Sequence, residues 1–443
     1  MQRVAHFITR WEWLILLLIL PPLLFPSGYW GFLLLVPLTL WTVRWVGTGR
    51  FLPRTPYDTA VLILALMMLV SLYAVFDIGL SFPKIAGVVM GIALFYGAVT
   101  YTRLRPDGPS HGGMWRVVGF VILAGVGMAL VGLVGMRWMG VFAPLNRLNA
   151  LLPDALSAIP GTVGGVVNAN QLAGTLDWVT PLLVACTLGL LCSLWQRRSW
   201  LLLFLSVFFL GGMSLFTVVM LAATQSRGGM LGLVAALLVM LAIRFRWGKW
   251  VLVTAVILVV ALAFYFNLGA ALLDSEATID DFGLQGRLEI WSRALYGLAD
   301  FPLTGMSMNG FRRVVHVLYP LFLISPDTDI AHAHNHLLQA GLDLGLLGLA
   351  AYLALWFISA GLLWQSWRRA TSSAHRTLIV GLSGSLVAGW MFGMLDAISL
   401  GSRPGFIWWL LLALVVAVHD AATADVFDAA TRSAAVSPAG GAE

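Results

Sequence analysis

The sequence predicts an all-α protein that crosses a membrane about twelve times. Of its 443 residues, 60% are hydrophobic and only 10% are charged, and the mean hydropathy is +0.90. Soluble domains have about a quarter of their residues charged, so most of this surface must face lipid. Apolar runs long enough to cross a hydrocarbon core of about 30 Å recur along the whole chain. These observations exclude a soluble fold.

The expected spans follow one another at short intervals. They are 12–27, 29–43, 57–76, 83–100, 115–135, 170–194, 199–223, 228–243, 250–272, 336–364, 377–395 and 404–420. An even number of spans places both termini on one side of the membrane. We therefore expect a single transmembrane domain over residues 1–420. Residues 421–443, rich in Ala and small polar residues, are expected to form a disordered tail.

Basic residues set the orientation of these spans. With the N-terminus in the cytoplasm, 17 of the 26 lysines and arginines fall on cytoplasmic segments and nine on outer ones. Short basic loops on the inner side follow the positive-inside rule. Both termini and the tail are therefore expected in the cytoplasm. The net charge of +6 is then explained by loop arginines, and we expect no nucleic-acid partner.

One outer segment, about 273–335, is far longer than the others. A loop of this length with its own pattern is more often functional than connective. Apolar residues recur at spacings of three and four from Leu288 to Leu298, and a second amphipathic stretch covers about 309–318. We therefore expect two short helices lying over the outer mouth of the bundle, in contact with membrane lipids.

Three of the eight histidines fall within five residues at the outer entrance to the tenth span. If a helix begins at the first of them, a polar stripe follows it: His332, His336, Gln339 and Asp343, with Asn335 beside Gln339. Such a stripe is costly in a membrane unless it faces a hydrated cavity or a ligand. A histidine here could accept a proton from a hydroxyl group. Zinc binding and a plain polar helix start are the other two interpretations.

Two outer arginines could hold an anion. Arg227 lies in a Ser-Arg-Gly-Gly turn between two spans, and Arg287 follows Gly286 at the start of the first loop helix. A guanidinium binds two phosphate oxygens at once and keeps its charge near lipid. The simpler interpretation is contact with ordinary lipid phosphates. Other outer arginines carry less local signal: Arg312 and Arg313 suit a surface role, and Arg137 and Arg147 are open to phosphate binding.

Two further polar positions lie at the outer ends of spans. Asp396 ends the eleventh span and could pair with Arg403, orient a catalytic histidine, or position an acceptor hydroxyl. Asn168 and Asn170 begin the sixth span, where helix capping alone would explain them.

These residues together resemble the O-antigen ligase and polymerase superfamily. The His-x-His-Asn-x-x-Leu-Gln stretch from His332 to Gln339 is similar to its signature. The Asn168–Asn170 start of a span, the Ser226-Arg227-Gly228 turn and Gly286-Arg287 match the family in the same order. The similarity covers about 165–395.

The resemblance implies a GT-C-like membrane glycosyltransferase in the bacterial inner membrane, with a periplasmic active site. It implies inverting transfer from a glycan on undecaprenyl pyrophosphate, with His334 as general base. Arg227 and Arg287 would bind the pyrophosphate, and Asp396 corresponds to the family's late acidic residue. His332, His336, Asn335, Gln339 and Asn170 are expected to support the site. Neither a metal nor another cofactor is implied.

The acceptor separates the members of this superfamily. The resemblance implies a ligase that transfers O-antigen polysaccharide to lipid A–core, in lipopolysaccharide biosynthesis. Polymerases often carry Arg-x₁₀-Gly motifs in outer loops, and none occurs here: Leu298 lies eleven positions after Arg287. A polymerase or a protein O-oligosaccharyltransferase on the same scaffold is the alternative. From another class, a lipid-linked glycan transporter would show repeats between its two halves, which this sequence lacks.

Overall fold

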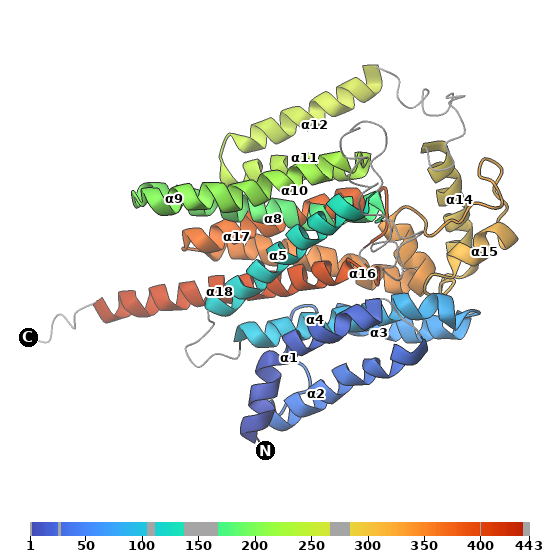
Figure 1. Cartoon of the computed structure of the whole chain (residues 1–443), viewed down its shortest axis with the longest axis horizontal. Helices are drawn as coiled ribbons and strands as arrows, with labels where there is room; N and C mark the ends of the chain where they lie inside the picture. The colour runs from blue at the N-terminus through green and yellow to red at the C-terminus, as the bar shows by residue number, and fades with distance from the viewer. Residues whose placement is uncertain are drawn as a thin grey trace, which may run out of the picture.

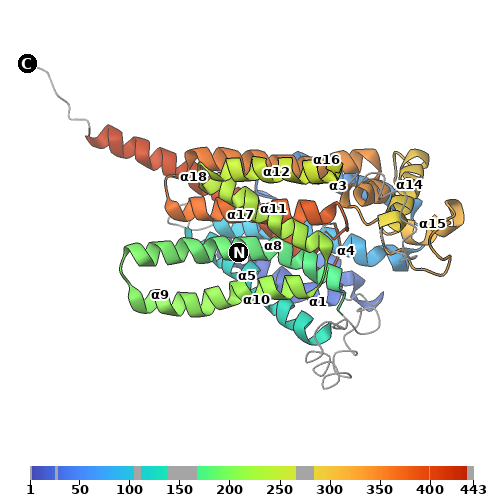
Figure 2. The same cartoon turned by 90° about the horizontal axis from the view of Figure 1, so that it is seen from above.

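The computed structural model describes residues 2–24, 28–103, 111–136, 167–265, 284–398 and 400–436. These residues form helices joined by turns, with no strand among them. Figures 1 and 2 show long helices running side by side along one direction, with α14 and α15 gathered beyond one end of the bundle. The all-helical membrane fold is therefore confirmed.

One helical segment coincides with each expected span in the described part of the chain. In order these are α1 (Gln2–Leu24), η1 with α2 (Gly28–Leu34, Leu35–Thr48), α3 with η2 (Asp58–Ser71, Leu72–Ala74), α4 (Ile78–Arg103), α5 (His111–Gly135), α8 (Ala169–Gln196), α9 with η4 and α10 (Trp200–Ser206, Val207–Gly211, Gly212–Ala223), α11 (Arg227–Arg244), α12 (Gly248–Tyr265), α16 (His336–Arg369), α17 (Ser373–Gly393) and α18 (Gly405–Val436). Eight of these segments are long and apolar enough to cross a membrane.

The C-terminal segment differs from the disordered tail expected after residue 420. Helix α18 continues to Val436, and residues 437–443 lie outside the described residues. Its alanine content favours helix, and two acidic residues attach it to neighbouring segments. Asp420 accepts from Arg103 Nε at 2.7 Å, and Asp425 lies 3.0 Å from His375 Nδ1.

Close packing of α8, α11 and α17 depends on small residues. A Cβ at Gly389 on α17 would lie 2.1 Å from the indole nitrogen of Trp178 on α8, and one at Gly232 on α11 would lie 2.7 Å from the Asp177 carboxylate. Small residues let membrane helices approach closely, where dispersion contacts replace the hydrophobic effect. This trio carries the turn that holds Arg227.

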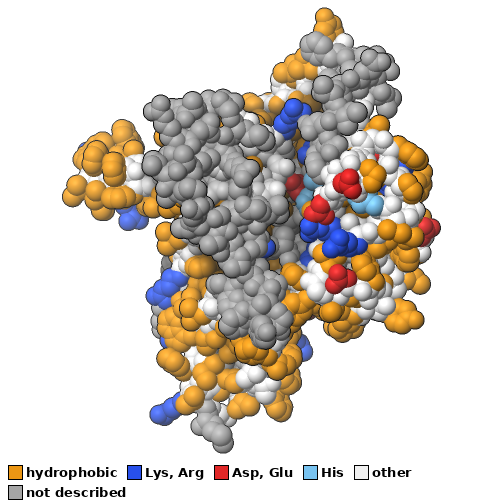
Figure 3. All heavy atoms as spheres, turned by 45° about the vertical axis from the view of Figure 1, so that its right-hand side comes forward, with side chains coloured by type: hydrophobic (Ala, Val, Ile, Leu, Met, Phe, Trp, Pro, Cys, Tyr) orange, Lys and Arg blue, Asp and Glu red, His pale blue; other side chains and the backbone are white. Residues whose placement is uncertain are grey.

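The long outer loop contains two helices, as the sequence predicted: α14 (Leu284–Asp300) and α15 (Phe311–Leu318). They enclose a small core of their own, to which Ile290, Phe311 and Ile330 belong. The earlier part of this loop, 273–283, the end of the expected span 250–272 and most of the loop 136–168 lie outside the described residues. Figure 3 brings this end forward and shows basic, acidic and histidine side chains gathered on it.

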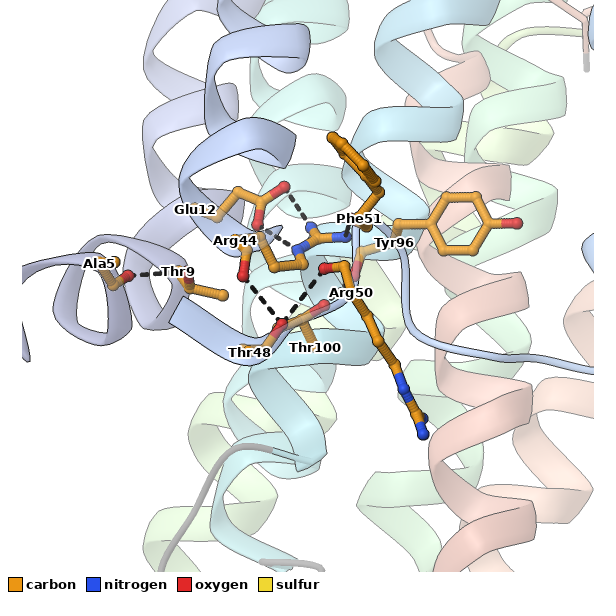
Figure 4. A network of polar contacts seen from close by, with 9 residues as sticks. All are labelled: Ala5, Thr9, Glu12, Arg44, Thr48, Arg50, Phe51, Tyr96 and Thr100. Carbon is orange, nitrogen blue, oxygen red and sulfur yellow. Dashed lines mark hydrogen bonds and ion pairs between the residues drawn. The ribbon is translucent and has the colours of Figure 1, made fainter. Parts of the chain in front are cut away.

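A buried ion pair joins α1 to α2 inside the bundle (Figure 4). Arg44 Nε donates to Glu12 Oε2 at 3.0 Å, Nη2 contacts the other carboxylate oxygen, and Nη1 donates to the Phe51 carbonyl at 3.0 Å. Glu12 is fully buried and Arg44 is 2% exposed. Charges within a membrane protein are costly unless paired, so this contact fixes the N-terminal hairpin.

Candidate active site

The histidine loop (residues 331–335) ends where α16 begins. Asn335 caps the helix: its Oδ1 accepts from the backbone N–H groups of Leu337 and Leu338 at 2.9 and 3.1 Å. Its Nδ2 donates to the Met394 carbonyl at 3.2 Å, which ties the loop to the end of α17. Because α16 starts at His336, the helical stripe that would begin at His332 does not form. The helix begins instead after Asn335.

Two histidines of this loop meet Asp396 and form the histidine–aspartate cluster (His332, His334, Asp396). His332 Nε2 lies 3.2 Å from Asp396 Oδ1, and the rings of His332 and His334 lie 4.3 Å apart, centroid to centroid. His332 Nδ1 accepts from the backbone N–H of His334 at 3.2 Å. The proton of neutral His332 is therefore on Nε2, which donates to Asp396. Of the three roles predicted for Asp396, this contact favours orientation of the histidines.

The protonation of the cluster follows from burial and nearby cations. Burial, with the charges of Lys84, Arg287 and Arg312, lowers the pKa of His332 to about 3. Burial also lowers the pKa of His334 to about 3; His332 and Arg287 add to this effect, and Asp396 opposes it. Burial raises the pKa of Asp396 above its usual range. At neutral pH both imidazoles are therefore in the neutral form, in which one ring nitrogen carries no proton.

His332, His334 and Asp396 also have the donor atoms of a metal site. One ligand atom from each lies within 4.8 Å of the others. A metal on His332 Nε2 would move the ring proton to Nδ1, which already accepts from the His334 N–H. The cationic groups whose charges act on His332 also oppose a divalent ion. The donor set therefore fits proton acceptance better than metal coordination.

A second polar network supports the histidine loop from below. Gln339 Oε1 accepts from the buried backbone N–H of Ala333 at 2.8 Å, and Gln339 Nε2 donates to Asp343 Oδ1 at 2.8 Å. Asp343 Oδ1 also accepts from the Asn309 N–H at 3.0 Å, and its Oδ2 pairs with Lys84 Nζ at 2.5 Å. Gln339 thus links the loop to α4 and to the outer helices.

His336 lies apart from the histidine–aspartate cluster. Its Nδ1 is 2.8 Å from the Tyr352 hydroxyl, and the rings of Trp356 and Trp390 meet it edge-on at 5.7 and 4.9 Å. It is 3% exposed and lines a small pocket with Lys84 and Gln339. These contacts enclose the His336 ring on several sides.

Of the arginines predicted from the sequence to bind an anion, Arg287 is the one whose charge acts on all three residues of the cluster. It belongs to the first turns of α14, and its Nε is buried without a hydrogen-bond partner among the described residues. A buried guanidinium N–H without a partner is costly. It is therefore available to an anionic ligand.

The other predicted residues are placed less centrally. Arg227 is exposed at the start of α11, where Ser226 Oγ accepts from the Gly229 N–H at 3.3 Å. Within the described part of the chain no hydrogen bond or ion pair joins Arg227 to the cluster. Asn168 caps α8 by accepting from the Gln171 N–H, and Asn170 lies in the first turn, half-buried. Arg312 pairs with Asp329; Arg137 and Arg147 lie outside the described residues.

Sequence reasoning did not single out two of the residues around the site. Lys84 follows Pro83 at the start of an expected span, and this position was the only local indication that its charge could enter the bundle. Asp177 is a lone acidic residue within an apolar run. It is fully buried, and neither carboxylate oxygen has a hydrogen-bond partner among the described residues. An ionisable residue inside a membrane helix is a functional candidate by default.

Residues 212–353 match the model of the O-antigen ligase family. This segment, about a third of the chain, is similar to that family. The matched segment runs from α10 into α16 and includes Arg227, Arg287, His332, His334 and His336. Asn170 and Asp396 lie outside the match. No curated protein matches the chain. The family resemblance noted in the sequence is thereby confirmed, and it supports ligase- or polymerase-type glycosyl transfer by a membrane protein.

Proposed function

We propose that this protein transfers O-antigen polysaccharide from undecaprenyl pyrophosphate to lipid A–core at the periplasmic face of the bacterial inner membrane. The observation that carries the proposal is the histidine–aspartate cluster, in which the ring of His334 lies 4.3 Å from that of His332, within the electrostatic reach of Arg287, whose buried Nε has no hydrogen-bond partner among the described residues. A base beside a phosphate-binding cation is what glycosyl transfer from a pyrophosphate requires. The O-antigen ligase family match supports the substrate class.

In the proposed reaction an acceptor hydroxyl attacks the anomeric carbon of the donor sugar, opposite the leaving group. The new glycosidic bond forms as the bond from carbon to phosphate oxygen breaks, so the configuration inverts. The hydroxyl proton passes to His334, and the electron pair leaves with undecaprenyl pyrophosphate. Arg287 and Arg227 stabilise the charge on that leaving group. No metal takes part in this scheme.

The low pKa of His334 fits this order of events. The charge of Arg287 is one of its causes, and a bound pyrophosphate would offset that charge. Donor binding would therefore raise the basicity of His334 when the acceptor arrives. Asp396 favours the protonated imidazole that follows. Its contact with His332 orients the neighbouring ring.

The test uses the purified full chain in vesicles with undecaprenyl-pyrophosphoryl glycan. Lipid A–core and an undecaprenyl-linked repeat are offered as competing acceptors, with and without EDTA. We expect glycan on lipid A–core, unaffected by EDTA, and a loss of about 10²–10⁴-fold in His334→Ala. His316→Ala is the matched control. His316 lies on α15, and its described hydrogen bond is to the Thr328 carbonyl, away from the cluster.

Other outcomes of this experiment would favour a different function or mechanism. Glycan on the undecaprenyl-linked repeat would indicate a polymerase, and activity lost to EDTA and restored by Zn²⁺ would restore the metal interpretation. Movement of the glycan across the bilayer without transfer would indicate a transporter. Unchanged ligation by His334→Ala would remove the assigned base.

A further inference from the structure

Helix α16 is broken within the membrane-spanning segment. Gly345 has φ 71° and ψ −179°, which divides α16 into an outer half-helix (His336–Leu344) and a longer helix that follows it. A positive φ of this kind is readily available only to glycine. The outer half-helix carries the histidine loop at its start, so the break sets its direction independently of the rest of α16.

The turn after α14 fills this break. Leu346 N–H donates to the Pro302 carbonyl at 2.7 Å, and Met306 N–H donates to the Leu342 carbonyl at 2.6 Å. The backbone groups that the break would leave unpaired in the membrane are thereby satisfied from outside the helix. We refer to this reciprocal backbone contact as the α14–α16 clip.

The clip has no space for a side chain at Gly345 or at Gly305, the two glycines that face each other across it. A Cβ at Gly345 would lie 2.5 Å from the Leu303 carbonyl oxygen. A Cβ at Gly305, whose φ is 66°, would lie 2.6 Å from the Leu342 carbonyl oxygen. Both obstacles are backbone atoms, which cannot rotate away as a side chain can. Any larger residue must therefore separate the two segments.

Helix α14 runs alongside the outer half-helix from the cluster to the clip. Leu298 contacts the position of Gly341, where a Cβ would lie 3.1 Å from its Cδ1. At the other end of α14, the Arg287 charge acts on His332 and His334. The C-terminal part of α14 therefore packs on the half-helix near the clip, and its N-terminal part carries Arg287, whose charge acts on the cluster.

We propose that Gly345, with Gly305 opposite it, is a positioning residue for glycosyl transfer. The clip holds α14 against the outer half-helix and thereby fixes Arg287 relative to His334. The inference rests on the proposed function, because it assigns those two side chains to leaving group and base. It also implies that α14 does not swing away from the histidines as a lid, since such a movement would break two backbone hydrogen bonds.

The first test is Gly345→Ala, with Gly361→Ala as the matched control. Gly361 lies in the same helix with no atom within 4 Å of an added Cβ. We expect kcat to fall about 100-fold in Gly345→Ala, as for a misplacement of about 1 Å. The control should stay within about twofold of the wild type, because alanine is well tolerated inside a helix. Gel filtration and thermal unfolding report whether each variant is folded.

A double-mutant cycle separates positioning from loss of folded protein. If the clip acts by setting Arg287 against His334, Gly345→Ala should cost much less in an Arg287→Lys background, where the two-point phosphate contact is already lost. Equal fold-losses in both backgrounds would overturn the positioning role. His334→Ala is assayed in parallel. If it is active, the proposed function fails. If it is inactive while Gly345→Ala is fully active, only the positioning role of the clip is refuted.

A cross-link tests the same inference without disturbing the break. Leu298→Cys and Gly341→Cys are combined after the native Cys186 and Cys192 are replaced by alanine. We expect a disulfide to form on oxidation and turnover to stay within about twofold, because the pair remains in contact throughout the reaction. A failure to cross-link would argue against close contact of the two segments, and a locked enzyme that regains activity on reduction would show that α14 must move.

Discussion

Replacing Gln339 by leucine tests whether the histidine loop depends on one amide side chain. The change removes the acceptor for the Ala333 N–H and the donor to Asp343, both at 2.8 Å. Ala333 is fully buried, so its unpaired N–H costs about 1–3 kcal/mol, and the lost hydrogen bond to a carboxylate about 1.5–3 kcal/mol. The sum of about 2.5–6 kcal/mol corresponds to a loss of transfer of up to about 10²–10⁴-fold.

The assay measures glycan transfer to lipid A–core together with thermal unfolding in detergent. Gln365→Leu is the matched control, because it makes the same substitution on the exposed surface of the same helix. We expect Gln339→Leu to lose activity and unfold at lower temperature, and the control to behave as the wild type. Wild-type turnover and an unchanged midpoint in Gln339→Leu would refute the view that this amide holds the loop.

Two other changes give separate readouts. The proposed base His334 is required in its neutral form, and its pKa is lowered to about 3. Under this proposal kcat/KM should show no decrease between about pH 7 and 5, where an unperturbed histidine of pKa about 6.5 would lose activity. Arg287→Gln removes a charge that lowers this pKa, so its acid limb should move to higher pH; an unmoved limb would contradict the electrostatic coupling. Arg44→Met leaves Glu12 buried without its partner and should destabilise the protein by about 3–5 kcal/mol. Combining it with Glu12→Leu should restore most of the unfolding temperature, and an equal loss in the double variant would argue against the ion pair.

The membrane spans could be predicted from the sequence because lipid leaves the backbone few choices. A segment in hydrocarbon must satisfy its own N–H and C=O groups, so each long apolar run becomes a helix. The Asn335 start of α16 was also open to prediction, since Asn is a favoured cap and its side chain meets two N–H groups of its own helix. These signals are local, and each depends on residues a few positions apart.

The break at Gly345 could not be predicted in the same way. Most of the run 336–364 is apolar, and the sequence therefore predicts one continuous span there. The break is stabilised by hydrogen bonds to Pro302 and from Met306, which lie about forty residues earlier in a loop with its own helical pattern. Likewise, the partner of Asp343 is Lys84 on α4. Nothing near Asp343 in the sequence indicates which cation it meets.

The three neighbouring histidines show how one cap divides similar residues between different roles. His332 and His334 precede Asn335, and the positive φ of His334, 48°, allows both rings to meet beside Asp396. His336 follows the cap, enters the helix and is enclosed by Tyr352, Trp356 and Trp390. The cap is encoded locally, but Asp396 and Trp390 come from a different part of the chain. From the alternating His-x-His-x-His pattern alone, any of the three could be the base. The enclosure of His336 and the contact of His332 with Asp396 support the proposed choice of His334.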